Sequence, residues 1–92
     1  DAAPYPEHGF AVHSLTAGGN GVTFAVENRG PGALDFTMDC SGAANAASHR
    51  GALVYTTSNL APGALALLHH LSPAGPGVWS WSYECEWARP GA

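Results

Sequence analysis

The chain has 92 residues, a formal net charge of −4 and only three basic residues, all of them arginine. Hydrophobic residues make up 46% of the chain and charged residues 11%, so it is too apolar for a disordered tail and we expect a packed core. Three cations cannot build the cationic face that nucleic acid or an anionic membrane requires, so neither is an expected partner. No run approaches the ~18 consecutive apolar residues of a transmembrane helix.

The first half of the chain predicts three strands. Residues 1–8 contain two prolines and no periodic pattern, and we interpret them as a linker arm. Residues 10–15 and 22–27 alternate in side-chain character, which predicts two strands joined by the glycine-rich turn at 16–21. Residues 34–41 predict a third strand, half-buried because its apolar residues share one face: Leu34, Phe36, Met38 and Cys40.

The second half begins with a small, polar loop, 42–49, which we expect to cross between sheets. Residues 53–57 predict a strand. Residues 59–71 are ambiguous, because leucine and alanine favour a helix but Pro62-Gly63 leaves too few residues for one. We interpret this segment as a strand with one face formed by Leu65, Leu67, His69 and Leu71.

The last predicted strand is the clearest. Residues 79–87 alternate without interruption, and one face carries Trp79, Trp81, Tyr83, Cys85 and Trp87. Residues 89–92 are interpreted as a tail. Six to eight short strands with Gly/Pro turns and no helix predict an all-β domain over 9–88. We expect an antiparallel β-sandwich that is immunoglobulin-like in general architecture.

Catalytic chemistry is not expected. Cys40, Asp39 and a histidine (His69 or His70) are the residue types of a cysteine hydrolase. However, Cys40 shares an apolar strand face and lies beside acidic residues, which favours a buried, structural thiol over a reactive one. The five histidines have no metal-ligand spacing, so we predict no metal and no cofactor.

Two alternatives remain for the cysteines. Both Cys40 and Cys85 are predicted to face the core, where they could form a disulfide between opposed sheets. They could equally be two reduced thiols that pack as small hydrophobes.

The aromatic strip also has two interpretations. Trp79, Trp81 and Trp87 supply more apolar area than one strand usually needs. They either pack entirely in the core, or one end, at Trp79 or Trp87, reaches past it and forms an exposed hot spot for a partner.

Scattered short motifs resemble a known domain. They are Val26-Glu27-Asn28-Arg29, Asp39-Cys40-Ser41, Asn45 and Ser48-x-Arg50-Gly51-x-Leu53. Together they resemble the C-terminal, SOH-type domain of the small-optic-lobes branch of the calpain family, over roughly residues 22–83. The resemblance places Asp39 and Cys40 in a structural motif and gives Cys85 no counterpart, and the segment 79–87 departs from the family pattern.

The resemblance carries functional implications. Such proteins are intracellular cysteine proteases with ubiquitin-binding zinc fingers and a separate papain-like core, and their terminal domain has no catalytic triad. It therefore implies a cytoplasmic, non-catalytic recognition or regulatory domain. Its partner would be a protein or peptide, with links to the ubiquitin pathway through the parent protein. Ser48 and Arg50 are candidate binding residues, although we expect Arg50 mainly to pin the crossing loop by pairing with Asp35 or Asp39.

A second hypothesis keeps the disulfide. In that case the chain would be a secreted, extracellular sandwich with a Cys40–Cys85 bond, and its exposed tryptophans would bind carbohydrate or protein.

Overall fold

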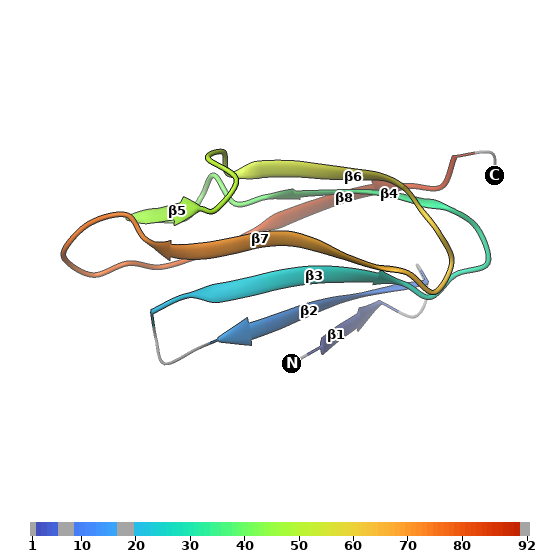
Figure 1. The fold of residues 1–92 in the computed structure, drawn as a ribbon, viewed down its shortest axis with the longest axis horizontal. Coiled ribbons are helices and arrows are strands. Elements are labelled where there is room, and N and C mark those ends of the chain that lie inside the picture. The colour runs from blue at the N-terminus through green and yellow to red at the C-terminus, as the bar shows by residue number, and fades with distance from the viewer. Residues whose placement is uncertain (1, 6–8, 17–19, 91–92) are drawn as a thin grey trace.

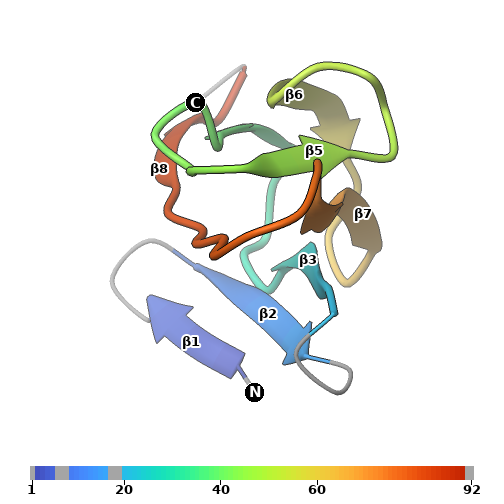
Figure 2. The same cartoon turned by 90° about the vertical axis from the view of Figure 1, so that its left-hand side faces the viewer.

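The structure is a computed structural model that describes residues 2–5, 9–16 and 20–90, the first of these segments as backbone. Eight strands and no helix occur in these residues: β1 (Ala2–Tyr5), β2 (Phe10–Thr16), β3 (Val22–Asn28), β4 (Leu34–Asp39), β5 (Ala46–Ser48), β6 (Val54–Leu60), β7 (Leu65–Pro73) and β8 (Glu84–Ala88). They form a five-stranded sheet, β1-β2-β3-β7-β5, and a three-stranded sheet, β6-β4-β8. Figure 1 shows the two sheets as layers, and Figure 2 views them from one end.

All strand pairs are antiparallel, so the predicted all-β sandwich is confirmed. The core lies between the sheets and is built by the side chains that alternate inward from each strand. In β3 and β4 every second residue is buried, as the sequence predicts. Phe10 and Phe36 join the two layers, with ring centroids 5.1 Å apart in an edge-to-face arrangement.

The chain crosses repeatedly between the sheets. The predicted crossing at 42–49 occurs, because the chain passes there from the sheet of β4 to the other sheet, but Ala46–Ser48 within the predicted loop form the strand β5. The strand order β2-β3-β7-β5 is that of the four-stranded sheet of an immunoglobulin domain, and β4 and β8 take the places of strands C and F. An immunoglobulin domain has a further strand beside F. In the described part of this chain, β8 pairs with β4 alone and is an edge strand.

The ambiguous segment contains a strand, β7, and no helix, as interpreted, but Asn59 and Leu60 belong to the end of β6 and the predicted faces of β7 are wrong. Phe24 pairs with His69 while Ala25 pairs with Leu67, so Leu68 is the extra residue of a β-bulge. The bulge turns both Leu68 and His69 inward. Leu65 and Leu67, which were predicted to share one face with His69, are instead 63% and 47% exposed.

The last strand is shorter than the sequence predicts. Only Glu84–Ala88 pairs with β4, and the preceding residues are attached by an isolated bridge between Ser80 and Ala44. In this irregular segment Trp79 and Tyr83 are partly buried, whereas the three residues between them are exposed, so the predicted alternation is kept only at its ends.

Both expected ends of the domain differ from the prediction. Four residues of the proposed linker arm, Ala2–Tyr5, pair with β2 as an edge strand, while residues 1 and 6–8 lie outside the described residues. Arg89, assigned to a tail, donates hydrogen bonds to the carbonyl oxygens of Gly9 and Gly32, both at 2.9 Å. Residues 91 and 92 lie outside the described residues.

Candidate interaction surface

Two tryptophans lie on the β8 side of the sandwich: Trp87 in the edge strand β8, and Trp81 in the irregular segment that precedes it. Trp87 packs edge-to-face on Phe10, with centroids 5.0 Å apart, and Trp81 packs on Phe24 at 5.2 Å. Both phenylalanines belong to the facing sheet and are buried. Each tryptophan is nevertheless 40% exposed. We call Trp81 and Trp87 the aromatic margin, because they join the core to the surface along the β8 side of the sandwich.

The third tryptophan has a different position. Trp79 is partly buried and packs against the core cluster, as does Tyr83, whose ring lies 5.1 Å from that of Phe24. The strip therefore does not pack entirely in the core, and its exposure falls on Trp87 at one end and on Trp81 within it, not on Trp79. Trp79 belongs to core packing, and Trp81 and Trp87 combine packing with exposure.

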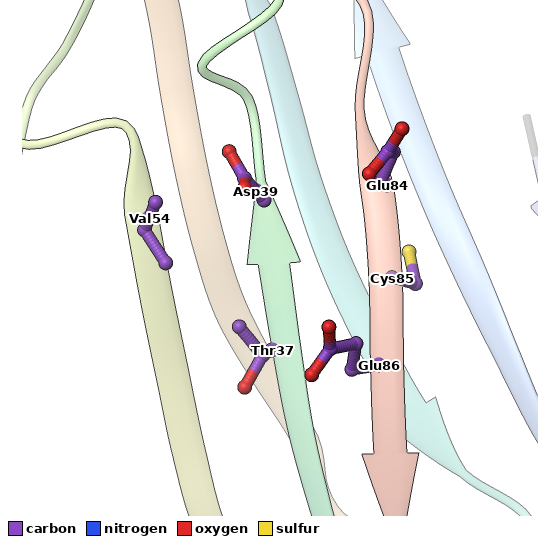
Figure 3. Close-up of a pocket in the computed structure, with 6 residues that line it drawn as sticks. All are labelled: Thr37, Asp39, Val54, Glu84, Cys85 and Glu86. Carbon is purple, nitrogen blue, oxygen red and sulfur yellow. The ribbon is translucent and has the colours of Figure 1, made fainter.

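The outer face of the three-stranded sheet is acidic. Four of the seven acidic residues lie on it, and we call them the acidic face: Asp35, Asp39, Glu84 and Glu86. Two of these carboxylates, Asp39 and Glu84, are direct cross-strand partners, and Glu86 lies opposite Thr37. Figure 3 shows Thr37, Asp39, Glu84 and Glu86 around a pocket of about 280 Å³ that Val54 and Cys85 also line.

Within the described residues, the arginine contacts lie away from this face. Arg29 pairs with Glu27, while Arg50 and Arg89 donate to backbone carbonyls elsewhere. Asp35 and Asp39 accept backbone N–H groups of Asn59 and Ser41, each at 2.8 Å.

The acidic residues of β4 and β8 differ in their local contacts. The hydrogen bonds from Ser41 lower the pKa of Asp39, so this carboxyl stays charged. Glu84 and Glu86 have no hydrogen-bond or ion-pair partner among the described residues and are exposed. Like charges placed across a strand pair repel, so the face favours a cationic neighbour.

Arg50 binds the β7 bulge, and the predicted pairing with Asp35 or Asp39 is wrong. Its Nε donates to the Leu68 carbonyl at 2.6 Å and its Nη2 to the Leu67 carbonyl at 2.8 Å. The guanidinium also lies 3.5 Å from the ring centroid of Tyr55 on β6. Arg50 therefore links the two sheets and satisfies carbonyls at the point where the bulge disturbs the ladder.

Ser48 is part of the same corner. Its hydroxyl lies 2.7 Å from Nδ1 of His69, and Nε2 of that ring lies 3.3 Å from the Met38 carbonyl. Because a carbonyl only accepts, Nε2 carries the proton and Nδ1 accepts from Ser48.

This serine and histidine resemble a nucleophile and its base only in composition. The His69 ring is fully buried and beyond the reach of a substrate. Burial also lowers its pKa, which makes it a weak base. The pair joins β5 to β7, so Ser48, like Arg50, is placed to hold the corner together.

The cysteines are free thiols, so of the two alternatives the structure shows the reduced pair and not the disulfide between opposed sheets. Met38 faces Cys85 across the β4–β8 pair, so Cys40 and Cys85 are diagonal neighbours within one sheet. Such neighbours are about 7 Å apart, farther than a disulfide spans. Burial raises the pKa of each thiol to about 11, and Asp39 adds to this effect at Cys40. Protonated thiols are poor nucleophiles, which fits the structural role predicted for them.

Two residues that sequence reasoning missed hold one end of the fold. Asn28 is fully buried, and its amide nitrogen donates to the carbonyls of Gly32 and Leu60 at 2.8 and 2.9 Å. Its amide oxygen accepts from Gly30 N–H and from Arg89. Asparagine in a glycine-rich turn is a signal for such capping. The long-range partner, Arg89, has no local signal.

Other kinds of site have no support in the described residues. No group of three or more His, Cys, Asp or Glu side chains is placed there to hold a metal ion. Nor is there a helix in the described part of the chain that is long and apolar enough to cross a membrane.

Comparison of the chain with models of protein families, with curated proteins and with solved structures finds no match.

Proposed function

We propose that this chain is a non-catalytic interaction or regulatory domain that binds a protein or peptide through the aromatic margin. The observation that carries the proposal is the 40% exposure of both Trp81 and Trp87 beside an edge strand. Tryptophan is the side chain most enriched at interface hot spots. Anchoring on Phe10 and Phe24 restrains each indole before binding, which reduces the entropy lost on association.

The proposal includes an intracellular, cytoplasmic setting and membership of a larger, calpain-like protein of the ubiquitin pathway. Both cysteines are free thiols, which supports a reducing compartment. The motif residues Asn28, Ser48 and Arg50 all make hydrogen bonds that fix the fold. They belong to the motifs on which the resemblance to the SOH-type domain rests. The aromatic margin lies in the segment that departs from that family, so its partner would be particular to this chain.

The test compares three immobilised baits: the parent chain, the double variant Trp81→Leu/Trp87→Leu, and Leu65→Ala. Leucine retains apolar packing on the core while removing the exposed rim of each indole. Leu65 is an exposed apolar residue on the other sheet and serves as the matched control. Circular dichroism and thermal unfolding establish that all three baits are folded.

We expect mass spectrometry to identify proteins that the parent and Leu65→Ala retain and the double tryptophan variant loses. Equal retention by all three folded baits would refute the aromatic margin as the binding surface.

A further inference from the structure

The free edge of β8 has two chemically different sides. On its inner side lie Cys85 and Trp87, and on its outer side lie the carboxylates of Glu84 and Glu86. The side-chain period of two therefore presents apolar and acidic positions in strict alternation along one edge. Any strand that pairs with this edge places its own side chains alternately against these two surfaces.

The other sheet edges are less suited to an added strand. β1 has four residues, one of them a proline, and β5 has only three, so each gives little backbone to pair. The outer residues of β6 are uncharged, so they offer no selection by charge: Val54, Thr56 and Ser58. In the described residues only β8 combines an unpaired edge, an exposed tryptophan and unpartnered carboxylates.

The charge pattern selects among possible occupants. A second copy that pairs through its own β8 would bring Glu84 and Glu86 against glutamates, and like charges opposite one another destabilise a strand pair. A strand with basic side chains on the outer side would instead meet carboxylates that have no partner in the part of the chain that the structure describes. Apolar side chains at the intervening positions would cover Trp87 and remove its exposed rim from water.

We propose that the free edge of β8 recruits, by strand addition, an extended peptide in which basic residues alternate with apolar ones. This inference rests on the proposed function and names the class of its partner. Main-chain hydrogen bonds to β8 would provide sequence-independent affinity. The alternation of Glu84, Cys85, Glu86 and Trp87 would select register and sequence.

The probe is a synthetic peptide of about nine alternating lysines and valines, long enough to span the five residues of β8. One control peptide carries glutamate in place of each lysine, and a second has the same lysines and valines in two separate blocks. Tryptophan fluorescence measures binding to the parent chain at low and high salt. Hydrogen exchange of the backbone amides locates the contact.

We expect the alternating lysine peptide alone to bind, to protect the amides of 84–88, and to bind more weakly at high salt. Glu86→Lys should weaken binding about tenfold. Glu27→Lys makes the same change in net charge on the other sheet and should leave binding unchanged. The double variant Glu84→Lys/Glu86→Lys should bind the glutamate peptide in preference.

Three results would overturn the proposal: no binding, protection at a different strand, or equal weakening by Glu86→Lys and Glu27→Lys. A concentration-dependent dimer that protects 84–88 would also overturn it, because a second copy would then occupy the edge. If the peptide does not bind but the parent bait still retains proteins that the double tryptophan variant loses, only this inference is refuted. If those partners are also absent, the proposed function fails with it.

Discussion

At the scale of single residues, His69 shows how burial sets a protonation state. Its ring is fully buried between β7 and β4, where Nε2 donates to the Met38 carbonyl and Nδ1 accepts from Ser48. Desolvation is the largest cause that lowers its pKa below the ordinary 6.5, and the nearby Arg50 and His49 lower it further. The Met38 carbonyl and Asp39 oppose this shift without reversing it. A neutral ring is therefore part of the folded state.

This protonation state predicts acid sensitivity. Between the folded and unfolded pKa values of His69, the unfolded chain binds more protons, so the free energy of unfolding decreases as pH falls below about 6.5. Urea unfolding of the parent at intervals from pH 7.5 to 5 measures this slope. His69→Gln has no titrating group and should show a flatter profile in that range. Parallel profiles for parent and variant would mean that His69 does not cause the acid sensitivity.

The sequence predicted the candidate site only as far as the alternating aromatic residues of the last predicted strand. Alternation identified Trp81 and Trp87 as a strip, but the depth of each ring depends on Phe10 and Phe24 in the facing sheet, which local sequence does not specify. The partner of Arg50 was missed for a related reason. A guanidinium binds carboxylates and carbonyls alike, and the receptive carbonyls exist only after β7 bulges.

At the scale of elements, the bulge in β7 is the feature that most affects its surroundings. At the bulge, the carbonyl oxygens of Leu67 and Leu68 both accept hydrogen bonds from the guanidinium of Arg50. Arg50→Ala would leave these carbonyls without that partner and remove the contact with Tyr55. We expect this substitution to lower the free energy of unfolding by about 1–3 kcal/mol, measured by urea denaturation.

The conservative variant separates geometry from charge. Arg50→Lys keeps the positive charge but cannot donate in parallel to two carbonyls, so its stability should lie between those of the parent and Arg50→Ala. If Arg50→Ala instead unfolds like the parent and reduces partner binding, Arg50 is a recognition residue.

The strands differ in how well their sequences specify them. β3 and β4 were predicted closely because apolar residues occupy one face and polar residues the other. In β7 leucines occur on both faces of the expected strand, so one extra residue hardly changes the apolar–polar pattern. The bulge could therefore not be detected from the sequence. β1 was missed because its proline-containing segment carries no alternation, and a proline is tolerated at a sheet edge.

At the scale of the whole molecule, Arg89 joins segments that are far apart in the chain. It follows β8 and donates to Gly9 before β2 and to Gly32 between β3 and β4, so it fastens the two sheets at one end. The guanidinium also lies directly against Gly30. A Cβ at Gly30 would be 2.5 Å from Nη2 and 2.7 Å from Cζ of Arg89. The glycine therefore provides space for the arginine.

This contact predicts a specific coupling between two positions. Arg89→Ala removes the hydrogen bonds and should cost about 1–3 kcal/mol. Gly30→Ala should destabilise the parent because the added methyl displaces the guanidinium. The same change should cost little in the Arg89→Ala background, because Gly30 is not among the residues with positive φ and its close neighbours are gone. The free energies of the two single variants would then not add.

Gly9 provides the matched control for this cycle. A Cβ there would also approach Arg89 Nη2, at 2.8 Å, but Gly9 has a φ of 75°, which strains any other residue. Gly9→Ala should therefore remain costly after Arg89 is removed, whereas Gly30→Ala should not. Urea unfolding of the parent, the three single variants and the two double variants measures both cycles. Additive costs for Gly30 and Arg89 would show that the arginine does not occupy the space the glycine leaves, and that another contact fastens this end of the sandwich.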